Sequence, residues 1–495
     1  MKIYNSISRE KEEFVPIHED FVGMYVCGPT VYSDVHLGNC RTFVSFDVIY
    51  RYLKYLGYRV RYVRNITDVG HLEGDADSGA EDKISQKARK EKLEPMEVVQ
   101  KYSEGFHAMM RKFNVLAPSI EPRATGHIIE QIEMVKKIIK NGYGYEKNGS
   151  VYFDTLKLVN DGGNYGQLSG RKIDELLAET REELKNQEEK RHPSDFAIWV
   201  KASPTHLMRW PSPWSEGYPG WHLECSAMST KYLGERFDIH GGGNDLKFPH
   251  HENEIAQNLG ACKCTPANYW IHGNMLLLNG KKMAKSDGNS ITPVELFSGN
   301  SLHVSKGYSP MVVRFFMLQT HYRSTLDLTD DALQAAEKGY KRLFEAVEAL
   351  DKIQGNSGQI SSDLDLQIEK LLVQIKEEMD DDFNTPKALA VIFELVSLIN
   401  GLKDGHLDKN QVKEITLHRL REVIHVFLWD VLGLDSEDDN ADDTVVDGLM
   451  ELIISMRQEA RERKDWGTSD KIRDSLKELK LQIKDGKEGT TWSKL

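Results

Sequence analysis

Residues 25–41 read Tyr25-Val-Cys-Gly-Pro-Thr-Val-Tyr-Ser-Asp-Val-His-Leu-Gly-Asn-Cys-Arg41 and join an apolar run to a helical pattern. The run Phe21–Val26 is apolar enough for a buried strand, and Pro29 forces the chain to leave the sheet. Apolar residues then recur at helical spacing until Gly57, after which residues 58–63 alternate as a strand does. A strand, a turn, a helix and a second strand in this order form a nucleotide-binding βαβ unit. The N-terminus of its helix, directly after Gly38, offers free N–H groups to a phosphate. The stretch therefore predicts an α/β fold with a Rossmann-type parallel sheet.

The composition is that of a globular chain, with 495 residues, 40% hydrophobic and 28% charged. This length suffices for about three or four domains. Because the sequence lacks a run of about 18 apolar residues and a secretory signal, we expect a cytoplasmic protein that does not enter a membrane. Five scattered cysteines favour reduced thiols over disulfides. The net charge of −13 argues against indiscriminate nucleic-acid binding, but it allows a local basic surface for one folded RNA.

Changes of pattern along the chain predict its domains. We expect a catalytic sheet domain over residues 1–120 and 218–265, an insertion over 121–217 and a lysine-bearing region over 266–326. Amphipathic helices predict a bundle over 327–434. The acidic run at 435–445 is typical of a flexible linker, and residues 446–495 predict a small mixed domain.

Finer expectations concern single elements. We expect helices over residues 83–113 and 128–140, and a hairpin turning at Asn148-Gly149. The sheet is expected to resume at residues 219–228 and 235–245. Residues 69–80 are rich in Gly and Asp, and residues 175–191 are rich in charged side chains. We interpret both as solvated segments.

A candidate metal site is indicated by His250 and Glu254, which are four residues apart and share one helix face. His251 is three residues from Glu254 and remains an alternative. Two thiolates would complete a zinc site, and the candidates are Cys27, Cys40, Cys225, Cys262 and Cys264. Cys27 and Cys225 fall at predicted strand ends of one sheet, whereas Cys262 and Cys264 fall in a predicted surface loop.

Lysines and glycines predict a nucleotide site. Lys282 and Lys285 lie on one loop rich in Gly, Ser and Asp, which could close over phosphates. Gly241 is the first of three glycines directly after a predicted strand, where a ligand can approach the backbone closely. Asp245 follows, where a carboxylate can meet ribose hydroxyls. The sequence His36-Leu-Gly-Asn39 combined with Lys282-Met-Ala-Lys-Ser286 is a far more specific indication of a nucleotide site than either motif alone.

These two motifs resemble the HIGH and KMSKS motifs of class I aminoacyl-tRNA synthetases. Longer segments resemble the cysteinyl-tRNA synthetases in particular, and they lie at residues 25–32, 64–68, 219–228, 240–257, 379–386, 458–466 and 489–492. Two positions depart from the family pattern. Asn39 replaces the second histidine of HIGH and can donate a hydrogen bond but cannot carry charge, whereas Ala284 removes a hydroxyl from KMSKS and leaves both lysines.

The resemblance implies a cysteine–tRNA ligase, which activates L-cysteine with ATP and Mg²⁺ and transfers it to tRNA(Cys). It implies catalytic roles for His36, Asn39, Lys282 and Lys285. It implies ATP contacts from Thr30, His36, Gly38, Asn39, Gly241, Asp245 and Lys285. It implies an amino-acid pocket that involves Gly28, Thr67 and Trp221. It implies one Zn²⁺ per chain, held by Cys27, Cys225, His250 and Glu254. It also implies that residues 266–326 contact the tRNA stem and that 446–495 bind the anticodon through Arg461, Trp466 and Asp485.

A zinc ion would help such an enzyme to distinguish cysteine from serine, because the two amino acids differ by only one atom. Shape differences discriminate by only about 1–3 kcal/mol, whereas zinc prefers a thiolate to an alcohol. We expect the protein to act as a monomer.

Two other functions are compatible with part of the pattern. A ligase that joins cysteine to an amino sugar would share the catalytic half, but the helical bundle and the tail with Trp492 argue against a small acceptor. A non-catalytic zinc protein that binds RNA would not need Lys282 and Lys285.

Overall fold

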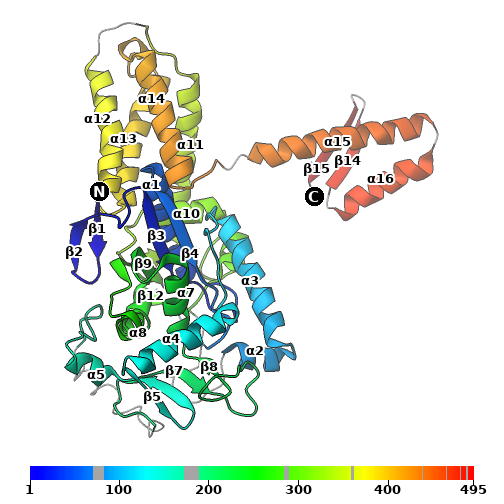
Figure 1. The fold of residues 1–495 in the computed structure, drawn as a ribbon. Helices are drawn as coiled ribbons and strands as arrows, with labels where there is room; N and C mark the ends of the chain where they lie inside the picture. Colours follow the sequence, from blue (N-terminus) through cyan, green and yellow to red (C-terminus); the bar gives the residue numbers. More distant parts are fainter. Residues whose placement is uncertain are drawn as a thin grey trace. The chain divides into compact units, whose positions relative to one another are not determined.

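The βαβ unit predicted from residues 21–64 is present in the computed structural model, where strand β3 (Phe21–Val26), helix α1 (Leu37–Tyr55) and strand β4 (Arg59–Arg64) follow one another. The structure describes residues 1–70, 83–171, 189–283, 289–357, 362–436, 439–463, 465–479, 481–486 and 489–494. Lys285 and most of the segments 69–80 and 175–191 therefore lie outside the described residues. The chain divides into two compact units, Met1–Asp435 and Ser436–Leu495, and Figure 1 shows the fold of each.

Four parallel strands form the central sheet of the first unit, in the order β10-β9-β3-β4. The two strands from the later part of the chain are β9 (Phe237–Gly243) and β10 (Ala267–Gly273). The predicted parallel sheet is thus confirmed. Because β10 pairs with β9, the sheet continues past residue 265, where we expected the catalytic domain to end.

Helix α1 begins directly after the His36 turn. His36 Nδ1 accepts a hydrogen bond from the backbone N–H of Asn39 at 3.4 Å, which caps the helix. The predicted apolar face is buried, and Gly57 follows the helix with φ of +94°, a conformation that favours glycine. The turn that opens α1 is therefore fixed by local sequence.

The helix predicted over residues 83–113 is wrong as a single element. The structure has two helices, α2 (Lys83–Glu91) and α3 (Pro95–Lys112). Pro95 is the first residue of α3, and Glu94 before it is extended, with φ of −75° and ψ of 147°. A proline disfavours the helical conformation of the preceding residue, so the break falls there.

An antiparallel sheet forms the insertion, in the order β5-β6-β7-β8. Its strands and helices are β5 (Gly144–Lys147), β6 (Ser150–Phe153), β7 (Phe196–Lys201), β8 (Gly217–Pro219), η1 (Thr125–His127), α4 (Ile128–Lys140) and α5 (Thr155–Asn160). Helix α4 has the predicted bounds. The hairpin turn at Asn148-Gly149 is also confirmed, with φ of 54° and 88°.

Residues 219–228 do not resume the central sheet, contrary to our prediction. Strand β8 ends at Pro219 in the sheet of the insertion, and helix α7 (Leu223–Leu233) follows. A short apolar run does not distinguish a strand from a buried helix, and Leu, Glu, Ala and Met all favour a helix. Cys225 therefore lies in the first turn of a helix.

The segment between β9 and the helical bundle contains His250 and Glu254 of the candidate metal site and Lys282 of the predicted lysine hairpin. Its elements are η3 (Asn244–Leu246), η4 (Lys247–His251), α8 (Glu252–Cys262), β11 (Leu276–Leu278), β12 (Lys281–Lys282), α9 (Pro293–Ser298), α10 (Pro310–Leu318) and β13 (Leu326–Leu328). The predicted lysine hairpin is present as β11 and β12, with Asn279 and Gly280 at positive φ. Strands β1 (Lys2–Asn5) and β2 (Glu10–Glu13) form a separate N-terminal hairpin.

The predicted helical bundle is present and forms the last part of the first unit along the chain (Figure 1). Its helices are α11 (Asp330–Lys352), α12 (Asp363–Asp380), α13 (Thr385–Lys403), η6 (Lys409–Gln411), α14 (Glu414–His425) and η7 (Val426–Val431). Helix α13 is long and apolar enough to cross a membrane, but it packs against α11 and α12 as a core helix of the bundle.

Buried charges join the end of the bundle to α1. Arg314 Nη2 lies 2.5 Å from Asp47 Oδ2, and Arg51 Nε lies 2.8 Å from the same oxygen. Arg314 also donates to the carbonyl oxygens of Phe113 and Leu432, at 2.7 and 2.8 Å. The segment around Leu432 is thereby fixed to helix α1.

The described residues of the second unit form two helices and one hairpin, as expected of a small mixed domain. They are α15 (Asp439–Glu462), α16 (Trp466–Glu478), β14 (Leu481–Gly486) and β15 (Gly489–Lys494). The acidic segment predicted as a linker over 435–445 is helical from Asp439 onward.

Candidate active site and metal centre

A cavity of about 430 Å³ opens at the carboxyl edge of the central sheet. Its walls come from the turns after β3 and β4, the start of α1, the loop after β9 and the segment from β10 to β12. Residues predicted for the site that line it are Cys27, Gly28, Thr30, His36, Gly38, Asn39, Thr67, Trp221, Cys225, Asp245, His250 and Lys282. The fold therefore brings the His36 turn and Lys282 to one cavity, as the ligand edge of an open α/β sheet predicts.

Other predicted residues lie elsewhere. Gly241 is buried and does not line the cavity, and a Cβ atom there would lie 2.2 Å from Cε1 of Phe46. This glycine lets α1 pack closely on β9, whereas Gly243, two residues later, reaches the cavity. Arg461 and Trp466 are exposed on the second unit, and Asp485 lies in β14.

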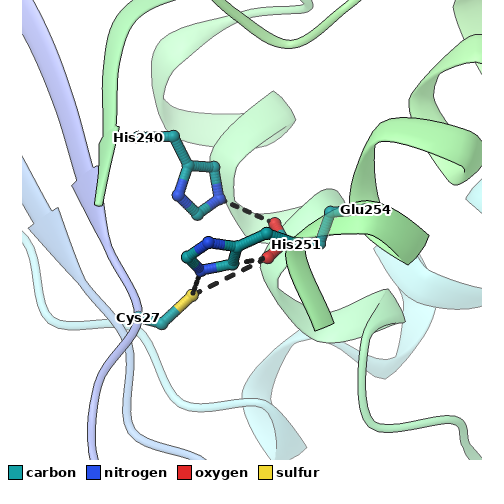
Figure 2. Close-up of side chains that lie close together, drawn as sticks. All are labelled: Cys27, His240, His251 and Glu254. Atoms are coloured by element: carbon teal, nitrogen blue, oxygen red, sulfur yellow. Dashed lines mark hydrogen bonds and ion pairs between the residues drawn. The ribbon is translucent and has the colours of Figure 1, made fainter. Parts of the chain in front are cut away.

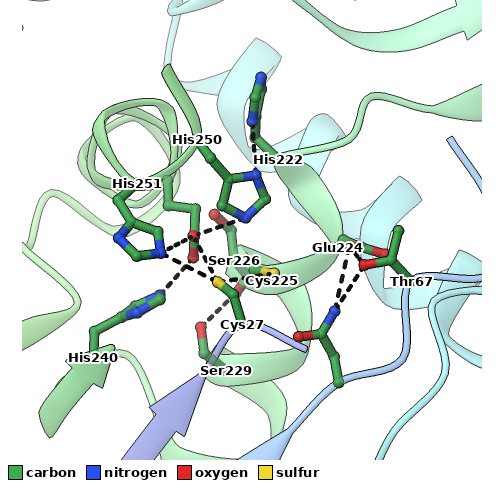
Figure 3. A network of polar contacts seen from close by, with 12 residues as sticks. Cys27, Thr67, His222, Glu224, Cys225, Ser226, Ser229, His240, His250 and His251 are labelled. Atoms are coloured by element: carbon green, nitrogen blue, oxygen red, sulfur yellow. Dashed lines mark hydrogen bonds and ion pairs between the residues drawn. The ribbon is translucent and has the colours of Figure 1, made fainter. Parts of the chain in front are cut away.

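Thiols, imidazoles and carboxylates gather beneath this cavity in two overlapping groups that could hold a metal ion. Both contain Cys27 and Glu254; one adds His240 and His251, and the other adds Cys225 and His250. Figure 2 shows the first group and Figure 3 the wider network. All the ligands of each group are buried.

The distances in the second group match a tetrahedral zinc site. Cys27 Sγ lies 3.7 Å from Cys225 Sγ and 3.7 Å from Glu254 Oε1, and His250 Nε2 lies 3.3 Å from the same oxygen. Zinc bonds of about 2.3 Å to sulfur and about 2.05 Å to nitrogen or oxygen place two sulfurs about 3.8 Å apart at tetrahedral angles. The same geometry gives about 3.6 Å for sulfur and oxygen and about 3.3 Å for nitrogen and oxygen. The residues present therefore fit a zinc ion.

The first group fits less well. His240 Nε2 lies 2.8 Å from Glu254 Oε2, which is a hydrogen-bond distance and shorter than the separation of two zinc ligands. His240 instead orients Glu254 from its outer oxygen, and Figure 2 shows the other oxygen, Oε1, facing Cys27. In the same way His222 Nδ1 lies 3.0 Å from His250 Nδ1, and such outer partners fix metal-bound imidazoles.

Charge also favours a cation in this place. Burial raises the pKa of the Cys27 thiol well above its usual value and that of Cys225 to about 12. Burial of Glu254 raises its carboxyl pKa as well. Buried anionic groups are costly unless they are paired or coordinate a metal. Two thiols and a carboxylate around one point are thus a donor set that a divalent cation would stabilise.

The remaining imidazole of the first group belongs to a chain of hydrogen bonds. His251 Nε2 lies 3.3 Å from Cys27 Sγ, and its Nδ1 lies 2.8 Å from His272 Nε2. Burial lowers the pKa of His251 and of His272 well below the usual imidazole value, so both are neutral near pH 7. His251 therefore serves as a neutral partner of the Cys27 sulfur.

The other candidate thiols lie outside this cluster. Cys262 and Cys264 are at the far end of α8, with their sulfurs 2.6 Å apart and Glu235 nearby. Cys40 is buried within α1. The choice of Cys27 and Cys225 among five thiols agrees with the geometry.

Sequence reasoning missed Glu224, which also lines the cavity. Its Oε1 accepts a hydrogen bond from Thr67 Oγ1 (Figure 3). The same oxygen accepts a second hydrogen bond, at 3.3 Å, from Asn65 Nδ2. Burial raises the pKa of this carboxyl well above its usual value. The sequence could have indicated Glu224 as a site residue, because it directly precedes the predicted metal ligand Cys225.

Arg41 was missed as well, although it follows the His36 turn. It is buried and donates to four backbone carbonyl oxygens: those of Asn274, Met275, His321 and Ser324, at 3.1, 2.6, 3.2 and 2.6 Å. Residues 274 and 275 line the cavity and lead into the hairpin that carries Lys282. Arg41 therefore fixes the lysine hairpin to the start of α1.

Comparison with known proteins identifies relatives along the whole chain. Residues 13–338 match the model of the class I (C) tRNA synthetase catalytic domain, and residues 374–434 match the DALR domain. A cysteine–tRNA ligase of Bacteroides thetaiotaomicron is 52% identical over 494 residues, which cover 99% of this chain and 98% of that protein. A cysteine–tRNA ligase of Porphyromonas gingivalis is 52% identical over 494 residues, with 99% of each chain covered.

A solved structure confirms the fold class. Mycobacterium tuberculosis methionyl-tRNA synthetase in complex with methionyl-adenylate superposes with a TM-score of 0.60 at 15% identity, and covers 84% of this chain and 92% of that chain. The family match and the full-length relatives agree with the sequence motifs and with the cavity in which they meet. The chain belongs to the cysteine–tRNA ligase family of class I tRNA synthetases.

Proposed function

We propose that the protein is a cysteine–tRNA ligase. It activates L-cysteine with MgATP to give cysteinyl-adenylate and pyrophosphate, and then transfers cysteine to tRNA(Cys). One observation carries this proposal: a thiol-rich cluster that fits zinc lies at the cavity where the His36 turn and Lys282 meet. Membership of the family supports it.

The proposed nucleotide site uses the start of α1 and the lysine hairpin. The first N–H groups of α1, with Gly38 and the amide of Asn39, are suited to phosphate oxygens, and Thr30 and Asp245 line the same cavity. Lys282 and Lys285 would neutralise the charge that develops on the phosphates. No covalent nucleophile is needed, since the reaction depends on positioning and electrostatic stabilisation.

We propose one zinc ion per chain, held by Cys27, Cys225, His250 and Glu254. When bound there, zinc supplies a soft coordination position that prefers a thiolate to an alcohol. His240 and His222 orient the carboxylate and the imidazole of this set. Trp221, whose ring centroid lies 4.7 Å from that of His250, would cover the side chain of cysteine, together with Gly28 and Thr67.

The remaining parts would serve the tRNA. We propose that residues 266–326 contact the acceptor stem and that 446–495 bind the anticodon through Arg461, Trp466 and Asp485. The protein would act as a monomer in the cytoplasm. The division into a catalytic domain, an insertion, a bundle and an anticodon-binding domain remains part of this proposal.

Pyrophosphate exchange followed by charging tests the proposal. We expect ATP–pyrophosphate exchange that depends on cysteine, far less exchange with serine, and charging of tRNA(Cys). Exchange without charging would favour a small acceptor such as an amino sugar. Absence of exchange by zinc-loaded protein would favour an RNA-binding protein without catalysis.

A further inference from the structure

Glu224 is a buried carboxylate on the cavity wall, and the proposed metal and nucleotide sites give it no role. Only 2% of the residue is exposed. Its Oε1 accepts from Thr67 and Asn65, whereas its Oε2 has no hydrogen-bond partner among the residues that the structure describes. Buried polar atoms are nearly always paired, so an unpartnered acceptor in a residue that lines the cavity points to a ligand that donates to it.

The neighbours of Glu224 limit what that ligand can be. Glu224 and Cys225 are consecutive in the first turn of α7, and both line the cavity. Asn65 also accepts a hydrogen bond from Gly28 N at 2.8 Å, so this corner includes the turn after β3. A ligand whose sulfur is directed at Cys27 and Cys225 thus has its adjoining carbon atoms beside Glu224.

We infer that Glu224 binds the α-ammonium group of the amino-acid substrate. In cysteine the ammonium group is on the carbon next to the one that carries the thiol, so both groups can reach consecutive residues of α7. An ammonium group has donors only and pairs with a carboxylate by charge-assisted hydrogen bonds. Thr67 holds the other carboxylate oxygen and sets the orientation of Glu224. This inference rests on the proposed function, since it assigns the amino-acid end of the same site.

A purely structural role makes a different prediction. If Glu224 only holds Thr67 and Asn65 in place, its replacement would weaken every ligand of the pocket alike. If it binds the ammonium group, the loss would be confined to ligands that carry one. Three thiols separate these cases: L-cysteine, cysteamine, which lacks the carboxylate, and 3-mercaptopropionate, which lacks the ammonium group.

Calorimetric titration of the zinc-loaded full-length protein with these thiols tests the inference. For Glu224→Gln we expect about 10- to 100-fold weaker binding of L-cysteine and of cysteamine, because a charge-assisted pair is lost. Binding of 3-mercaptopropionate should change by less than about twofold. Asp34→Asn is the matched control, since Asp34 is an exposed carboxylate on the same cavity and its removal should affect no ligand strongly.

Equal weakening of all three thiols, or unchanged binding of L-cysteine, would overturn the inference. If Glu224→Gln does not fold, Glu224→Asp keeps the charge on a shorter side chain, and the affinity ratio of L-cysteine to 3-mercaptopropionate should still fall. An unchanged ratio in that variant would refute the inference too. Pyrophosphate exchange by the wild type reports on the proposed function separately, so the two can fail independently.

Discussion

The pair His240 and His250 offers a direct test of which histidine belongs to the proposed metal centre. His250 Nε2 lies 3.3 Å from Glu254 Oε1, inside the proposed ligand set, whereas His240 Nε2 lies 2.8 Å from the outer oxygen Oε2. Loss of an outer partner typically weakens metal binding by about 10- to 100-fold, or about 1.4 to 2.7 kcal/mol. We therefore expect His240→Leu to raise the zinc dissociation constant by that factor while one zinc ion still binds.

Replacement of His250 should have a larger effect, because it removes a ligand. We expect His250→Leu to lose stoichiometric zinc on gel filtration, and competition with a chromophoric chelator measures both constants. His240→Gln is the matched control, since its amide N–H can still donate to Glu254 and should restore most of the affinity. If His240→Leu loses the metal and His250→Leu retains it, the group with His240 and His251 holds the ion and the reasoning fails.

Three further predictions concern residues around the cavity and the bundle. A lysine at position 41 cannot keep the four hydrogen bonds that Arg41 donates to carbonyl oxygens, so Arg41→Lys should misplace Lys282. We expect kcat of pyrophosphate exchange to fall about 100-fold while the zinc content stays unchanged. An unchanged kcat would contradict this. Arg314→Met leaves Asp47 with one fewer partner and should lower the free energy of unfolding by about 3–5 kcal/mol in urea titrations; a loss below about 1 kcal/mol would show that the pair is dispensable. Burial alone would raise the pKa of Asp330, but hydrogen bonds from Tyr308 and Ser305 lower it to about 2. A lowered carboxyl pKa stabilises the fold above the unfolded value of 3.8, so the melting-temperature difference between wild type and Asp330→Asn should shrink from pH 5 to pH 3.

Local signals predicted much of the fold. The strand at residues 21–26, the helix closed by Gly57, helix α4 and the Asn148-Gly149 hairpin all depend on neighbours in the sequence. Where the predictions were wrong, two local patterns competed. Pro95 divides one helical pattern into two helices, and of residues 219–228, where the central sheet is predicted to resume, 223–228 form the start of helix α7.

The candidate site was predictable only in part, since most of its contacts join distant segments. The zinc-type cluster was implied by family resemblance, and periodicity alone left both His250 and His251 open. Glu224 meets Thr67 across 157 residues, and Arg41 meets its carbonyl partners across more than 230. Such pairings depend on which strands lie side by side, and a single sequence does not record this.

The order of the chain has a consequence for its synthesis. Cys27 precedes Glu254 by 227 residues, and Cys225 and His250 come late as well. At about 5–20 residues per second, a ribosome needs about 11–45 s to reach Glu254 after it has added Cys27. During that time the first thiol has none of its later companions, so loading of the proposed zinc ion would follow the emergence of α8.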